Sequence, residues 1–334
     1  MKELQRRLDD FQQRHAWLAF PVAVAKKFGE DRGGQLAALV AYFAFFGIFP
    51  LLLVLVTVLG LVLKNNPDLQ HRIVNSALAQ FPIIGDQLKA GKLNRTGVGL
   101  IVGLVGTFIG ARGMAAAMQD AANAVWGVPY AHRPKFPMNL LRNLGLLIVV
   151  GGGLVGTTVL TGYATSLAGH GLVSRVIGIV VTTVLNVGVF FLSFRLATAK
   201  SVESRSLAPG AVLAAIGWQV LQLLGNYLVQ RQIAHASAVY GFFAIVIGLL
   251  TWLYLAALVT VYALEIDVVR ARRLWPRSLI PGPPLTEADH EALVQRARTE
   301  QRLEEQKIEV EFPQPENNDT NPDGSRAERY TRRR

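Results

Sequence analysis

The chain has 334 residues, of which 51% are hydrophobic, and its mean hydropathy is +0.33. It contains no cysteine, which excludes disulfides, thiolate metal sites and thiol nucleophiles. Its six histidines include no pair at metal-ligand spacing, which argues against a zinc hydrolase. The net charge of +11 comes from residues 1–284, which carry 25 Lys and Arg against 11 Asp and Glu. We therefore expect contact with anionic lipid headgroups and no binding of nucleic acid.

Long stretches of the chain contain no charged residue at all. A helix needs about 20 mostly apolar residues to cross a bilayer core of about 30 Å. The charge-free stretches indicate an all-α, polytopic membrane bundle formed by residues 35–270. The six predicted spans are residues 35–63, 96–118, 143–163, 176–194, 210–230 and 242–265.

Residues 1–34 are expected to form an amphipathic N-terminal segment. Residues 2–14 predict a short polar helix, whereas residues 16–28 mix apolar side chains with Lys26 and Lys27. That mixture suits a helix lying in the membrane interface, and a soluble helix packed on the bundle is the alternative. Residues 65–95, between the first two spans, predict a second amphipathic helix that breaks at Pro82.

Proline and glycine mark two of the spans. Pro50 lies near the middle of the first span, where the loss of a backbone donor predicts a kink. The second span carries five glycines at steps of four and three, which share one helix face and allow close helix packing. That face would serve a contact within the chain or a homo-oligomer equally well. These glycines are Gly99, Gly103, Gly106, Gly110 and Gly113.

Basic residues between the spans predict the orientation. If both termini share one side, the segments on that side hold 7, 4 (counting Arg112 at the inner end of the second span), 3 and 13 Lys and Arg, against 5, 1 and 1 on the other. Lys and Arg are enriched on the cytoplasmic side, so both termini are expected in the cytoplasm. Residues 271–334 then form a cytoplasmic tail. Thr286 and Asp289 can cap a charged helix over about residues 286–308, and the polar remainder is expected to be disordered. The tail could recruit a partner.

The fifth span carries a polar face on an otherwise apolar helix. Two interpretations remain open, a polar path for a headgroup or solute and hydrogen bonding between helices. The candidate residues of this path are Gln219, Gln222, Asn226 and Tyr227, with Asn186 of the fourth span facing them.

Three charged residues stand at the ends of spans. Charged groups in a membrane are costly and are therefore functional candidates. Arg112 and Asp120 lie at the inner end of the second span and Glu265 ends the sixth, so pairs of Arg112 with Asp120 or Glu265 are conceivable. Their role would be coupling or gating; alternatively, Arg112 reaches lipid phosphates and Glu265 only ends its helix.

Motifs of catalysis are missing from the sequence. It has no phosphate-binding glycine loop ending in Lys and Ser or Thr, no nucleophile elbow and no paired carboxylates in a loop. We expect no cofactor, no metal and no enzymatic activity.

Short motifs in order along residues 35–270 resemble the YihY/BrkB family of bacterial inner-membrane proteins, once called the ribonuclease BN family. They include Ala41-Tyr42, Phe49-Pro50-Leu51-Leu52, Asn123, Trp126-Gly127-Val128-Pro129, Arg133, Pro209-Gly210-Ala211, Tyr240-Gly241, Trp252-Leu253-Tyr254 and Glu265. The chain departs from the family pattern at Gly47, Ala263 and Arg112.

The resemblance implies a six-span inner-membrane protein linked to envelope integrity. Three functions follow as hypotheses. The first is a transporter or flippase of an amphiphilic envelope molecule, the second a non-transporting scaffold, and the third a membrane-bound ribonuclease. The third fits the sequence least, because a nuclease gathers carboxylates or histidines around a metal.

Overall fold

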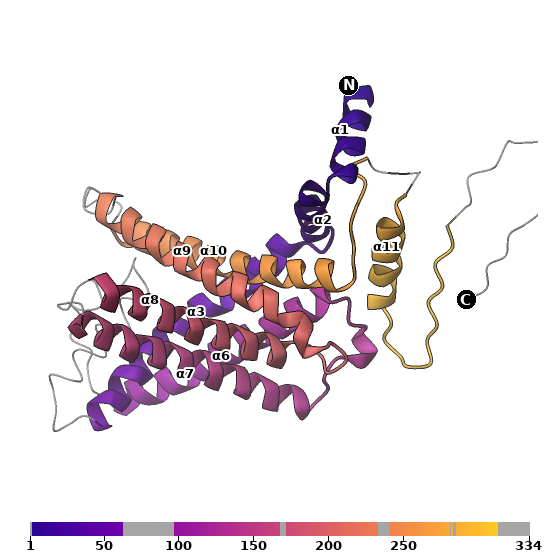
Figure 1. The fold of residues 1–334 in the computed structure, drawn as a ribbon. Helices are drawn as coiled ribbons and strands as arrows, with labels where there is room; N and C mark the ends of the chain where they lie inside the picture. Colours follow the sequence, from indigo (N-terminus) through magenta and orange to yellow (C-terminus); the bar gives the residue numbers. More distant parts are fainter. Residues whose placement is uncertain are drawn as a thin grey trace, which may run out of the picture.

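The computed structural model describes residues 2–62, 97–167, 172–232, 241–280, 282 and 285–312, and within these residues every regular element is a helix (Figure 1). The described part of the chain is thus all-α, as predicted. The N-terminal helices are α1 (Lys2–Arg14) and α2 (Ala16–Glu30). Helix α1 consists mostly of polar residues, and α2 contains Pro21. Both helices stand crosswise to the long helices, at one end of the bundle (Figure 1).

Six long helices occupy the ranges for which spans are predicted. They are α3 (Gly33–Val62), α6 (Gly97–Val125), α7 (Met138–Leu167), α8 (Leu172–Ala197), α9 (Ala208–Gln232) and α10 (Gly241–Ala271). They run side by side (Figure 1), and α7 to α10 extend beyond the predicted spans at both ends.

Four stretches of these helices are long and apolar enough to cross a membrane, judged over the described residues. They are Met138–Thr157, Val176–Ala197, Ser204–Gly225 and Val246–Ala271, and Gly33–Gly47 is a shorter apolar helix. Their outward side chains are apolar and exposed, for example Ile148, Val184 and Leu223. In water this surface would be costly, but it is the surface that a lipid-embedded helix presents.

Glycines let α3 and α6 approach each other closely. A Cβ placed on Gly110 would lie 2.5 Å from Gly47 Cα, and one on Gly113 would collide with the ring of Phe43. Two of the five predicted stripe glycines therefore pack against α3 within the chain. The backbone at Gly99, Gly103 and Gly106 is helical, but the packing around them lies outside what the structure describes.

The other helix pairs also meet at small residues. A Cβ on Gly153 of α7 would lie 2.5 Å from Val189 of α8, and one on Gly217 of α9 would lie 2.6 Å from Val259 of α10. Small residues at such contacts let backbones come close enough for dispersion to hold the helices together. Gly152, by contrast, has open space around it.

The most deeply buried residues gather at the end of the bundle beside α1, α2 and α11. There the side chains of Phe194, Leu207, Leu264, Val268 and Leu274 are fully shielded. We call this the α11 end. Here the helix termini and their connections pack on one another, as in a soluble protein.

Helix α11 (Glu287–Thr299) begins with the predicted capping box, in which Thr286 accepts from the Asp289 N–H and Asp289 accepts from the Thr286 N–H. It was expected to continue to about residue 308, and it ends at Thr299 instead. The cause is a contact with the bundle, because Gln301 O accepts a hydrogen bond of 2.9 Å from Ala131 N–H. Residues 301–312 contain no helix.

Several sequence predictions lie outside the described residues or side chains. They concern the helix within residues 65–95, the disorder beyond residue 312 and the surroundings of Pro50. The backbone of α3 is helical through Pro50. The kink therefore stays a prediction.

Candidate functional site

The end of α6 is built from the motif Trp126-Gly127-Val128-Pro129. Gly127 has a φ of +59°, which glycine adopts without a Cβ clash. Its N–H donates to Ala124 O, and the Val128 N–H donates to Asn123 O, both at 2.9 Å. This is a Schellman motif, which satisfies the last carbonyls of a helix, and Pro129 prevents its continuation.

Three cations bind the remaining carbonyls at this helix end. Lys27 Nζ donates to Val125 O over 2.8 Å, Arg272 Nη2 to Trp126 O over 2.7 Å, and Arg133 Nε to Val128 O over 3.2 Å. The cations also balance the partial negative charge at a helix C-terminus. Three segments remote in sequence thus converge on one point.

Lys27 also forms an ion pair with Glu265 of α10. Lys27 Nζ lies 3.1 Å from Glu265 Oε2, and the carboxylate is fully buried. Lys27 also donates hydrogen bonds to Val125 O and Asp31. A charge this deeply buried is tolerated because it has an opposite charge beside it.

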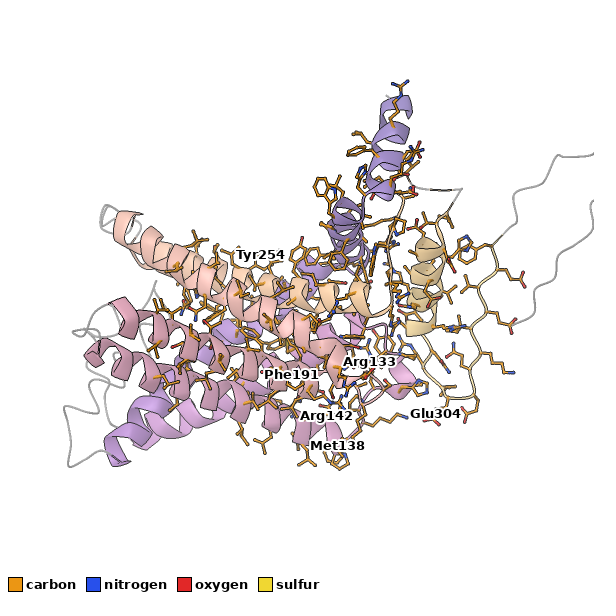
Figure 2. All side chains as sticks on the ribbon, in the orientation of Figure 1. Arg133, Met138, Arg142, Phe191, Tyr254 and Glu304 are labelled. Atoms are coloured by element: carbon orange, nitrogen blue, oxygen red, sulfur yellow. The ribbon has the colours of Figure 1, made fainter. Side chains whose placement is uncertain are left out.

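A cavity of about 370 Å³ opens next to this pair. It lies between the corner joining α2 to α3, the end of α6, and α11. Figure 2 shows Arg133 on this side of the bundle. The charged residues that line the cavity are Lys27, Glu30, Asp31, Arg32, Arg133, Arg296 and Glu300. The cavity is thus polar, and the carboxylates of Glu30 and Asp31 are already engaged by Arg277 and Lys27.

A polar junction joins α1, α2 and α11 through residues 277–279. Arg277 is 1% exposed and donates to Asp289 over 2.8 Å and to Glu30 over 2.9 Å. Lys26 Nζ reaches Asp289 over 2.8 Å as well. On the other side, Asp9 of α1 accepts from the Leu279 N–H and the Ser278 hydroxyl, each at 2.8 Å. The junction holds α11 in a fixed position.

Two carboxylates of the junction, Asp289 and Asp9, are held in their charged form. Burial alone would raise the pKa of Asp289, but hydrogen bonds from Lys26, the Ser278 N–H, Arg277 and Thr286 outweigh it and lower the pKa. The pKa of Asp9 is also lowered, because donors from Leu279 and Ser278 outweigh its burial.

The motif Pro209-Gly210-Ala211 is explained by a second buried acid of α10. Asp267 Oδ1 accepts a hydrogen bond of 2.6 Å from the Gly210 N–H, which lies in the first turn of α9. A Cβ on Gly210 would collide with Asp267 Oδ2 and would lie 2.5 Å from Ala263 O. Glycine is therefore required for α10 to cap α9 from the side.

Asn123 links α6 to α8. It is 2% exposed, donates to Gln119 O and Ala197 O, and accepts from the Ala199 N–H over 2.9 Å. Gln119 in turn donates to Asn143 of α7 over 2.6 Å. These amides fix three helix ends relative to one another.

Part of the polar face predicted on α9 lies against α8. Gln219 Nε2 of α9 lies 3.5 Å from Thr183 Oγ1 of α8, so the polar face of α9 contacts the neighbouring helix. Asn186 lies one turn further along α8 and is 7% exposed. Gln222 is half-buried on α9. Asn226 and Tyr227 lie on α9 where side chains are not described, so their part in a path stays a prediction.

The three charged residues proposed for coupling, Arg112, Asp120 and Glu265, do not pair with one another. Glu265 pairs with Lys27, and Asp120 lies 3.7 Å from Arg133. Arg112 is exposed on α6 and makes no ion pair with any described residue. The conceivable pairs of Arg112 with Glu265 or Asp120 are thus replaced by other partners, and a coupling role stays a prediction.

Sequence reasoning missed Lys27, Arg277 and Asp267. Their shared signal is a charge beside an apolar segment, which is common at the ends of membrane helices. Over the described residues, no group of three or more His, Asp or Glu side chains could hold a metal ion.

A family model described as virulence factor BrkB matches residues 24–282. The chain belongs to this family. The matched range begins in α2 and includes Lys27, Glu265, Asp267 and Arg277, whereas α11 lies beyond it. BrkB membership confirms the resemblance inferred from the motifs.

The chain resembles several curated proteins at low sequence identity. Over 276 residues the chain is 26% identical to the inner membrane protein YhjD of Escherichia coli, covering 75% of this chain and 80% of that protein. It is also 26% identical over 276 residues to a UPF0761 membrane protein of Vibrio vulnificus, covering 78% and 85%. A ribonuclease-like protein of Bacillus subtilis, YfkH, matches only 85 residues at 33% identity, or 25% of this chain and 30% of that protein. No solved structure matches the chain. The chain is thus a membrane protein of the BrkB family.

Proposed function

We propose that the chain is a six-span protein of the bacterial inner membrane that moves an amphiphilic, lipid-like molecule of the cell envelope. The length and apolar composition of α3 and α6 support two spans beyond the four already described. The name of the relative YhjD supports the location. The basic residues near the helix ends support termini in the cytoplasm, which places the α11 end on that side.

The contact between Gln219 and Thr183 carries the transport proposal. Both residues lie within helices that are otherwise apolar, and Asn186 is buried one turn away. A polar seam at this depth offers hydrogen bonds to a headgroup that crosses the apolar layer. The cavity at the α11 end, with Arg32 and Arg296 in its lining, would receive an anionic headgroup.

The experiment is lipid movement in proteoliposomes that hold the purified full-length protein. One anionic and one zwitterionic fluorescent lipid would be tested for access to an impermeant quencher. We expect quenching above that of empty liposomes, lost when Gln219→Leu is combined with Asn186→Leu. The control is Thr251→Val, because Thr251 is exposed and bonds only Ile247 O of its own helix. Folded protein that moves neither lipid would contradict unaided lipid transport.

The polar junction favours a second candidate, a scaffold that displays α11 and the chain beyond it to a partner. Deleting residues 313–334, which leaves α11 and the lining of the cavity in place, separates the two functions. A scaffold would lose its effect on envelope integrity, whereas a transporter would keep lipid movement. The third candidate, a ribonuclease, requires metal-dependent cleavage of RNA by purified protein free of contaminating nuclease.

A further inference from the structure

The burial pattern of α1 is opposite to that of a helix on a soluble protein. Its polar residues Asp9 and Gln12 are 5% and 4% exposed, whereas Leu8 and Phe11 are 55% and 51% exposed. Gln12 Nε2 donates to Arg277 O over 2.6 Å, on the same side as the contacts of Asp9 with residues 278 and 279. A helix normally turns its apolar face to the core. The apolar face of α1 therefore has some other partner.

The open face has the composition of a helix that rests on lipid. Arg7, Phe11 and Arg14 follow at steps of four and three, so two guanidinium groups flank the phenyl ring, and both arginines are exposed. Trp17, at the start of α2, is 69% exposed and adds a further exposed apolar side chain after those of α1. Aromatic and aliphatic side chains enter the boundary of the acyl chains, while arginines stay at the level of the phosphates.

The arrangement of the helices supports the same partner. If the membrane normal follows the long helices, α1 lies along the membrane plane (Figure 1). The segment after α10 rises between α2 and α11 to the lower end of α1 (Figure 1), where Asp9 bonds residues 278 and 279. Leu39, Tyr42 and Phe46 of α3 are also exposed, as expected for a helix surface that meets lipid.

We propose that the face formed by Leu8, Phe11 and Trp17, with Arg7 and Arg14 beside it, docks on the anionic lipid surface of the membrane. This contact is independent of what the protein transports. Because Asp9 and Gln12 bind residues 277–279, and Arg277 binds Asp289, the contact also fixes the depth of the polar junction and of α11.

The full-length protein contains no cysteine, so single-cysteine variants need no altered background. Leu8→Cys, Phe11→Cys and Asp10→Cys would each carry a polarity-sensitive fluorophore, in nanodiscs of zwitterionic lipid with or without anionic lipid. Asp10 is exposed one turn from both Arg7 and Arg14 and points about 160° away from Leu8 around the helix, so it is the polar control. We expect a blue shift and quenching by lipid-borne quenchers at positions 8 and 11, stronger with anionic lipid, and quenching by aqueous iodide at position 10.

A second variant tests the charge. Arg7→Gln combined with Arg14→Gln should remove the difference between the two lipid compositions at position 11. Equal iodide quenching at positions 8, 10 and 11 in both nanodiscs would overturn the proposal. A blue shift that does not depend on lipid charge would also overturn it. So would a blue shift that appears only when a soluble partner protein is added to the nanodiscs. Lipid movement is not measured, so failure here leaves the transport proposal untouched.

Discussion

Lys27 of α2 and Glu265 of α10 form a buried ion pair, with 3.1 Å between Nζ and Oε2. The pair lies where α6 ends, since Lys27 also binds Val125 O. One lysine therefore neutralises the buried carboxylate of Glu265 on α10 and caps a third helix. Its loss would expose two costs at once, an unpaired buried carboxylate and an unsatisfied carbonyl.

Removing this lysine should destabilise the protein strongly. Lys27→Met leaves Glu265 buried without its partner, which typically costs about 3–5 kcal/mol. We expect that loss in the free energy of unfolding measured by denaturant in detergent micelles. Adding Glu265→Leu should restore part of it, since both charges are then gone. Lys135→Met, at an exposed site, should change little. Equal stability of Lys27→Met and Lys135→Met would show that the ion pair is absent.

The contact between α3 and α6 should not tolerate a methyl group. In Gly110→Ala the new Cβ would lie 2.5 Å from Gly47 Cα, so the two helices would have to separate. Overpacking of this kind costs about 1–3 kcal/mol. Gly152→Ala is the control, because nothing lies within 4 Å of its Cβ position. Thermal unfolding of the two variants side by side measures the difference, and equal midpoints would contradict the close approach.

The docking of α11 should weaken in acid. The pKa of Asp289 in the folded protein lies below its ordinary value of 3.8, because four donors outweigh its burial. A lowered pKa stabilises the docked state fully well above pH 3.8, and this stabilisation declines as the pH falls below that value. Hydrogen exchange of α11 between about pH 6 and 3 should therefore increase toward the acid end, beyond the intrinsic pH dependence.

Two variants calibrate that experiment. Asp289→Asn should expose α11 to exchange already at pH 6 and flatten the profile. Glu291→Gln changes an exposed acid of the same helix, whose partner is Gln295, and should keep the profile of the natural chain. A profile of Asp289→Asn that matches the natural chain would exclude Asp289 as the titrating group.

Gly127 should be sensitive to substitution for a conformational reason. Its φ of +59° is costly for any residue with a Cβ, so Gly127→Ala should lose about 1 kcal/mol of unfolding free energy. Gly29 in α2 has open space around it and a helical backbone, so Gly29→Ala should instead gain about 0.5–1 kcal/mol. Opposite signs for the two variants, measured by denaturant unfolding, are the expected result.

The sequence predicts the helices well because their signals are local. Charge-free stretches mark α7 to α10, and Thr286 with Asp289 marks the start of α11. The end of α11 could not be predicted in this way. Residues 300–308 remain charged and suited to a helix, but Gln301 O is bound by Ala131 of a distant segment.

The candidate site could be predicted only in part, because its contacts join distant segments. The polar face of α9 is visible as a period in the sequence, and Gln219 does contact α8. Nothing local indicates that Glu265 pairs with Lys27 rather than Arg112, or that Asp267 binds the first turn of α9. Because α1 is polar over most of its length, its sequence does not indicate that Asp9 and Gln12 face inward.

The three cations at the end of α6 constrain the order in which the protein assembles. The ribosome makes α6 after Lys27 but long before Arg272, so Trp126 O lacks its donor until the whole of α10 has been made. Contacts this remote in sequence form late, after a costly loop closure. The α6 end is therefore completed only when the last long helix joins the bundle. Nascent chains that stop before Arg272 should accordingly leave this end open to proteases, although their earlier helices are already inserted.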